Sequence, residues 1–139
     1  MIRPGALGDM IVTLPALGAI RDHFPHAFIE IMGYPRYLEL IKGRYYADVV
    51  SRFDQPDISH LFVEDAEIPR LFRERLSHMD LIISFVSGRD GVFSRNLNRV
   101  KARRIIHYDP FPAGNKAIHM IDHFLQSLDS LHITCADTV

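Results

Sequence analysis

The sequence predicts an α/β protein with a doubly wound, mostly parallel, Rossmann-like sheet. Short apolar runs alternate along the chain with segments whose apolar residues recur at helical spacing. Residues 81–86 form a continuous apolar run, which is typical of a strand buried on both faces of a parallel sheet. Glycine-bearing loops follow the carboxyl ends of two predicted strands, where sheets of this kind bind ligands.

The composition is that of one globular domain over residues 1–139. Hydrophobic residues make up 47% of the chain and charged residues 24%, a balance that supports a core of ordinary size. A formal net charge of −1 gives no indication of nucleic-acid binding. The single cysteine, Cys135, excludes an intrachain disulfide and fits a reducing cytoplasm. No apolar run approaches the roughly 18 residues of a membrane span, so we expect a soluble protein.

The opening segment places two glycines and an acid ahead of an amphipathic helix. A glycine loop that opens a helix allows close approach of the backbone to a ligand, with N–H groups pointing outward. Asp9 has two compatible interpretations here, as the N-cap of the helix or as a general base at the lip of a pocket.

The start of this helix has two alternatives. If the helix begins at Asp9, Pro15 lies inside it and should kink it; if it begins near Thr13, Pro15 lies in the tolerated first turn. We favour the early start. The apolar residues at helical spacing are Met10, Ile11, Leu14, Leu17, Ile20 and Phe24.

The remaining elements follow from apolar periodicity and from glycine and proline boundaries. In the helix after Pro69, we expect Leu71, Phe72 and Leu76 to face inward. Residues 54–67 are acid-rich and predict a loop with at most one short strand. The predicted strands are 27–32, 47–51, 81–86 and 104–107, and the predicted helices after the first are 37–42, 69–77, 93–100 and 116–131.

The opening segment also resembles a known family. Arg3 to Asp9, followed by Thr13 to Leu17, is similar to the opening of the family 9 glycosyltransferases, the lipopolysaccharide heptosyltransferases. Asp80 to Ser84, with its glycine loop and the basic stretch to Tyr108, is similar to the middle unit of that family. His119 to Leu125 resembles the His-x-x-Asp-x-x-Leu helix that ends the family's N-terminal domain. The three matches occur in the family's order and span nearly the whole chain.

The resemblance implies the N-terminal, acceptor-binding half of a two-domain bacterial GT-B enzyme that acts in lipopolysaccharide inner-core assembly. Such an enzyme transfers heptose from ADP-heptose to an acceptor sugar with inversion, in the cytoplasm or at the cytoplasmic face of the inner membrane. The family's catalytic acid falls on Asp9, and neither a metal nor a cofactor is implied. Donor binding belongs to a C-terminal domain that this chain lacks, so we expect the isolated chain to be inactive. Only Met1, Ile2 and Arg3 precede the first turn, which also indicates a fragment.

We predict acceptor contacts at Arg3, Gly5, Gly8 and Arg89. Inner-core acceptors carry phosphates and acidic sugars, and arginine forms bidentate pairs with such anions. Arg89 lies in the loop after the central strand and belongs to a basic set for which a solvated helix face is the alternative. Within this set, residues 95 and 99 would share one helical face. Its other members are Arg95, Arg99, Lys101, Arg103 and Arg104.

Other chemistries find less support in the sequence. His119 and His123 lie four residues apart, as metal-binding histidines on one helical face can, but a third ligand is not evident beyond guesses at His107 and Asp109. The Gly5–Gly8 loop matches neither a Walker A loop nor a dinucleotide fingerprint. Two other functions remain open. One is a non-catalytic α/β module that binds a phosphorylated small molecule at the Gly5–Asp9 loop, and the other is a truncated reading frame without an independent function.

Overall fold

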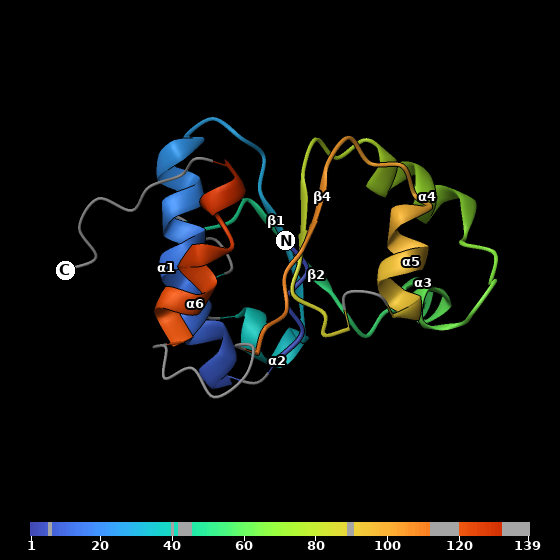
Figure 1. Cartoon of the computed structure of the whole chain (residues 1–139), viewed down its shortest axis with the longest axis horizontal. Coiled ribbons are helices and arrows are strands. Elements are labelled where there is room, and N and C mark those ends of the chain that lie inside the picture. Colours follow the sequence, from blue (N-terminus) through green and yellow to red (C-terminus); the bar gives the residue numbers. More distant parts are fainter. Residues whose placement is uncertain (6, 40, 42–45, 89–90, 112–119, 132–139) are drawn as a thin grey trace.

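In the computed structural model, four short strands pair in parallel and helices lie on both sides of them (Figure 1). The structure describes residues 1–5, 7–39, 41, 46–88, 91–111 and 120–131. Strand β1 (Glu30–Gly33) pairs with β2 (Val49–Arg52), and β3 (Ile82–Ser84) pairs with β4 (Ile105–His107). The prediction of an α/β protein with parallel strands is therefore confirmed.

Residues 1–3 join the two strand pairs. Ile2 forms parallel bridges to Met32 of β1 and to Ser84 of β3. The amide of Ile2 donates to the carbonyl of Ile83 at 2.8 Å, and the amide of Arg3 donates to the carbonyl of Met32 at 2.8 Å. The order across the strands is thus β2, β1, residues 1–3, β3, β4. The chain leaves this central position directly into the glycine loop.

Two groups of helices cover the strands (Figure 1). Helices α1 (Leu7–His23) and α6 (Met120–Gln126) lie together on one side. Helices α3 (Pro56–Ser59), α4 (Arg70–Ser77) and α5 (Val92–Asn98) lie on the other. The shorter elements are α2 (Pro35–Leu38) and the 3-10 turns η1 (His60–Phe62) and η2 (Asp129–Leu131).

The two inner strands, β1 and β3, are buried on both faces, whereas β2 and β4 at the edges are partly exposed. Ile31 and Ile83 belong to the core under α1 and α6, whereas their neighbours Met32 and Ile82 belong to the core under α4 and α5. This alternation follows from the two-residue period of side chains along a strand. The same burial fixes the register, because a one-residue slip would exchange the two cores.

Several details differ from the prediction. Residues 56–62 form α3 and η1, where we expected a loop and at most one short strand. Pro56 is the first residue of α3, a position that proline favours, and burial of Ile58 and Leu61 stabilises the two turns. Leu71 was predicted to face inward but is 79% exposed, since only Phe72 and Leu76 of α4 face the core.

The long first helix behaves as the early start predicts. Pro15 lies inside α1, where it cannot donate to the carbonyl of residue 11. The last helix was predicted over 116–131; within the described residues α6 ends at Gln126 and is followed by η2, and the predicted start lies outside the described part of the chain. None of the helices in the described ranges is both long enough and apolar enough to cross a membrane.

Candidate functional site

Asp9 lies at the carboxyl edge of the strands, in the first turn of α1. Because α1 begins at Leu7, Asp9 is the third residue of the helix rather than its N-cap. Its side chain is 48% exposed. A carboxylate in a first turn is stabilised by the free N–H groups and the positive end of the helix dipole. The sequence therefore places an acid at the helix start, and the fold turns that helix start toward solvent.

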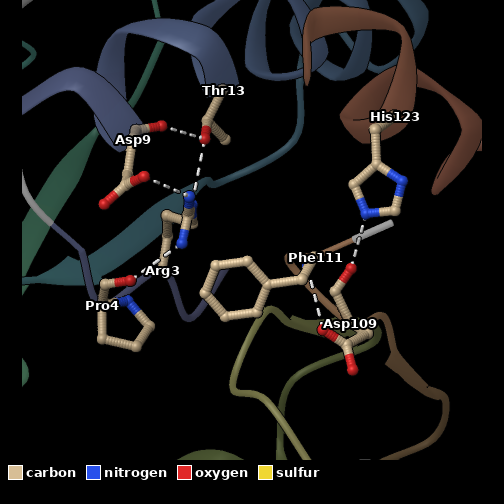
Figure 2. Close-up of polar contacts among 7 residues, drawn as sticks. All are labelled: Arg3, Pro4, Asp9, Thr13, Asp109, Phe111 and His123. Carbon is tan, nitrogen blue, oxygen red and sulfur yellow. Dashed lines mark hydrogen bonds and ion pairs between the residues drawn. The ribbon is translucent and has the colours of Figure 1, made fainter. Parts of the chain in front are cut away.

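Arg3 lies beneath Asp9 and is buried, with 3% of its surface exposed (Figure 2). Its Nη2 is 3.8 Å from Oδ1 of Asp9, its Nε donates to Oγ1 of Thr13 at 3.0 Å, and its Nη1 donates to the carbonyl of Pro4 at 2.9 Å. Burial lowers the pKa of Arg3, and the nearby charge of Asp9 opposes that change. An arginine stays protonated in proteins, so Asp9 has a buried cation on its inner side.

Thr13 connects the backbone of Asp9 to the same arginine. The Thr13 side chain is fully buried, and its Oγ1 donates to the carbonyl oxygen of Asp9 at 2.6 Å while accepting from Arg3 (Figure 2). A threonine hydroxyl commonly bonds the carbonyl four residues earlier in a helix. Arg3 thus reaches both the side chain and, through Thr13, the main chain of Asp9. The ion pair with Arg3 acts on the carboxylate itself, and the hydrogen bond from Thr13 fixes the backbone from which it projects.

Aromatic rings close the site from behind. The guanidinium carbon of Arg3 is 4.7 Å from the ring centroid of Phe124 in α6 and 5.9 Å from that of Phe85, which follows β3. Cation–π contacts of this kind favour a desolvated arginine. Nearby, His123 in α6 is hydrogen-bonded through Nε2 to the carbonyl of Asp109 at 2.7 Å (Figure 2). Helix α6 therefore anchors both Arg3 and the chain that leaves β4.

The two glycines of the loop have different surroundings. A Cβ at Gly5 would lie 2.8 Å from the Cβ of Asp9 and 3.2 Å from Nη1 of Arg3, so a side chain there would displace the acid or the arginine. A Cβ at Gly8 would meet nothing within 4 Å. Gly5 is required for packing of the site, whereas Gly8 leaves open space beside Asp9, the kind of space a ligand needs.

The predicted site residues are only partly brought together. Arg3, Gly5, Gly8 and Asp9 form one cluster, but Arg3 faces inward, which favours a positioning role over direct contact with an acceptor. Arg89 lies outside the described residues.

The described arginines of the basic set each contact a different part of the chain. Arg95 pairs with Glu64 at 3.5 Å, Arg103 lies 3.9 Å from Asp80, and Arg104 donates to the carbonyl of Ser130 at 2.9 Å. Arg99 donates to Oδ1 of Asn96 at 3.1 Å. This dispersal favours the interpretation of the set as a solvated surface.

Metal ligation finds no support in the described ranges. They contain no group of three or more His, Cys, Asp or Glu side chains placed to hold a metal ion. His119 lies outside these ranges, and His123 is bound to the carbonyl of Asp109. His107 is bound through Nε2 to Oδ1 of Asn98 at 2.7 Å.

Sequence reasoning missed two supports of the site. Thr13 lies four residues after Asp9, on the same face of the helix, so its spacing could have indicated the contact. Phe124 lies more than a hundred residues from Arg3 in sequence, and only the packing of α6 on α1 brings the two together.

A cavity lies at the amino edge of the strands, opposite Asp9. It is an apolar cavity of about 450 Å³ lined by residues that include Met1, Phe24, Phe28 and Met79. The Met1 amine donates to the carbonyl of Glu30 at 2.7 Å, and burial lowers its pKa to about 6. The cavity and the loop that carries Asp9 (residues 5–9, the acid loop) thus lie at opposite ends of residues 1–3, the central segment of the strand arrangement.

Comparison with known proteins gives no relative for this chain: no protein-family model, no curated protein and no solved structure matches it. Its function is therefore inferred from its own residues and their arrangement.

Proposed function

We propose that this chain is the acceptor-binding half of a GT-B glycosyltransferase of the heptosyltransferase type, with Asp9 as its general base. The observation that carries the proposal is the half-exposed carboxylate of Asp9, held by buried Arg3 in a loop whose sequence resembles the family 9 opening. The partners in this proposal are a lipopolysaccharide core acceptor and, through a further domain, ADP-heptose. The site would work in the cytoplasm or at the inner face of the inner membrane.

The strand order supports a doubly wound Rossmann-like sheet as the framework. If residues 1–3 are counted as the first strand, the order across the sheet becomes 3-2-1-4-5 in chain sequence. This is the order of the classic nucleotide-binding sheets, whose ligands bind at the carboxyl ends where strands 1 and 4 part. Asp9 follows strand 1 in this numbering, which supports a ligand-facing role for it in such a sheet.

The reaction that this geometry suits is an inverting displacement. Asp9 accepts the proton of an acceptor hydroxyl as its oxygen forms a bond to the anomeric carbon of the heptose. The bond from that carbon to the phosphate oxygen breaks, and ADP leaves with the electron pair from the opposite face. Arg3 faces the carboxylate of Asp9 and Thr13 fixes its backbone, contacts that support the positioning that general-base catalysis needs besides basicity.

A non-catalytic module that binds a phosphorylated molecule is the alternative. The open space at Gly8 and the amino end of α1 suit an anion. The carboxylate of Asp9 lies at the same place, however, and would repel a phosphate at close range. An intact-mass measurement of the natively produced protein separates the two functions. A transferase requires a second domain of similar size, whereas a module of 16.0 kDa does not.

Substitution of the acid tests the catalytic proposal. In the protein that joins this chain to its donor-binding domain, we expect Asp9→Asn to lower kcat by a factor of about 10² to 10⁴, since this is the usual contribution of a general base. The free energy of unfolding should fall by about 1 to 3 kcal/mol, because asparagine keeps the shape of the side chain but removes the charge that faces buried Arg3.

Asp22→Asn is the matched control, because Asp22 is an exposed acid on the same helix, far along it from the loop. It should retain wild-type kcat in an assay of heptose transfer from ADP-heptose to an inner-core acceptor. Near-normal turnover by Asp9→Asn would contradict the assignment of the base. The isolated 139-residue chain should transfer nothing.

A further inference from the structure

An aromatic cluster lies at the same carboxyl edge of the strands as Asp9. Phe53 directly follows β2 and is buried, and the rings of Tyr34 and Phe62 meet it nearly at right angles with centroids 5.6 and 6.0 Å away. Phe62 also packs on Phe93 at 4.8 Å. Tyr34 is 39% exposed and Phe62 is 50% exposed. Two aromatic rings are therefore supported from below and partly open to solvent.

Phe62 is held in this exposed position by a buried amide. The Nδ2 of Asn96, in α5, donates to the carbonyls of Leu61 and Val63 at 2.9 and 3.0 Å. Leu61 is fully buried, so the turn that carries Phe62 is fixed on both sides of that residue. An exposed phenylalanine on a loosely held turn would be unremarkable. A fixed one resembles a preorganised contact surface, which binds at a lower entropic cost.

The cluster is connected to the acid loop through Gly33. A Cβ at Gly33 would lie 3.0 Å from the carbonyl oxygen of Arg3 and 3.4 Å from Cε of Met10, so the end of β1 packs against the loop that holds Asp9. Tyr34 follows Gly33 directly, and the amide of Phe53 donates to the carbonyl of Gly33 at 2.8 Å. Tyr34 and Asp9 therefore follow two segments that are neighbours in the strand order, β1 and residues 1–3, at the same carboxyl edge.

Charged side chains border the cluster on two sides. Arg52 and Asp54 flank Phe53 and pair with each other at 2.9 Å, and Glu64, two residues after Phe62, pairs with Arg95 at 3.5 Å. An apolar centre with a polar rim fits a ligand that is apolar on one face and polar at its edge. A pyranose ring has this character, with C–H groups on its face and hydroxyls around its edge.

We infer that Tyr34 and Phe62 form a stacking subsite for a pyranose ring of the acceptor. This inference rests on the proposed glycosyltransferase function, because it supplies the sugar ring whose hydroxyl Asp9 would deprotonate. The ring face packs on the aromatic side chains, and its hydroxyls reach the flanking ion pairs. The subsite supplies orientation, while the chemistry stays at Asp9.

Saturation-transfer NMR on the 139-residue chain tests this subsite, with methyl heptopyranoside as the probe. Irradiation of the aromatic protons should transfer saturation to the C–H protons of one sugar face. Phe62→Ala and Tyr34→Ala should each weaken binding about tenfold, since an aromatic contact adds to the area that the ring buries. Phe62→Leu keeps an apolar side chain against Phe93. It should therefore fold normally but lose the saturation transfer from the aromatic protons of residue 62 to the sugar.

Leu71→Ala is the control, because Leu71 is the most exposed of the large apolar side chains in the described ranges and lies on α4. It should bind the sugar like the wild type. Equal binding by the Phe62 variants and Leu71→Ala would overturn the subsite, as would displacement of the sugar by ADP. The two proposals fail separately. If turnover survives Asp9→Asn, the assignment of Asp9 as the base is contradicted but the sugar subsite is not. If sugar binding survives Phe62→Ala, the subsite is contradicted but the assignment of the base is not.

Discussion

At the scale of single residues, Asp9 is defined by what surrounds it. The carboxylate is exposed on one side and faces a buried guanidinium on the other, and its backbone is tied to the same arginine through Thr13. Arg3 was predicted as an acceptor contact from its place beside the loop. Its burial instead indicates that it positions the acid, a role that local sequence does not reveal because burial depends on Phe85 and Phe124.

The two loop glycines should respond in opposite ways to alanine. Gly5→Ala should lower the free energy of unfolding by about 1 to 3 kcal/mol, because the new methyl group overlaps Asp9. Gly8→Ala should raise it by about 0.5 to 1 kcal/mol, because Gly8 is an exposed helical residue with space for a methyl group. Urea denaturation of the two variants measures both effects. Changes of the same sign would show that the loop is packed differently.

At the scale of elements, the sequence predicts most of what the structure contains. Strand positions followed from apolar runs, and all four observed strands overlap the predicted ones. The failures have physical causes. Residues 56–62 mix polar and apolar side chains without a clear period, and tertiary burial of Ile58 and Leu61 stabilises their helical turns. The placement of Arg95, Arg99 and Arg104 on separate partners likewise depends on contacts distant in sequence.

One ion pair fixes the connection from α1 to β1 and β2. Asp48 accepts hydrogen bonds from Nη2 of Arg21 and from the amide of Ile29, each at 2.8 Å. The hydrogen bond from Arg21, followed by that from Ile29, lowers the pKa of the Asp48 carboxyl. The carboxylate form therefore stabilises the fold at neutral pH. This contribution is lost as the pH falls through the lowered pKa.

Asp48→Ala should release this connection locally. We expect faster hydrogen exchange at the amide of Ile29, because that amide loses its carboxylate acceptor. The same acceleration should appear in the wild type as Asp48 is protonated at acidic pH, after correction for the intrinsic exchange rate. Asp57→Ala, at a partly exposed acid in the first turn of α3, is the control and should leave Ile29 protected. Unchanged protection in Asp48→Ala would contradict the assigned role of the pair.

At the scale of the whole molecule, three residues link the two halves of the strand arrangement. Residues 1–3 hydrogen-bond to β1 on one side and to β3 on the other, and the same segment leads into the acid loop. The carboxyl end of this segment therefore carries the proposed chemistry, and its amino end borders the apolar cavity. That cavity could not be predicted from the sequence, because its walls come from α1, β1, β3 and α4 together.

The Met1 amine should make stability depend on pH in a defined window. Burial lowers the pKa of this amine in the folded chain to about 6, whereas the unfolded amine titrates near 8. The unfolded chain thus binds more protons between these values, so the free energy of unfolding should rise by roughly 1 to 3 kcal/mol from pH 6 to pH 8. Acetylation of the amine removes the titration. Urea denaturation across this range should show a smaller rise for the acetylated chain, and equal rises would contradict the burial of the amine.

Amide chemical-shift mapping with an inner-core oligosaccharide shows whether the acceptor binds beside Asp9, because it distinguishes the two edges of the strands. We expect the largest shifts in the 139-residue chain to fall on Gly5, Gly8, Asp9 and Tyr34. Shifts confined to residues of the amino-edge cavity, such as Phe24 and Met79, would place the ligand at the wrong end of the central segment. The absence of any shift at millimolar oligosaccharide would contradict acceptor binding by this chain altogether.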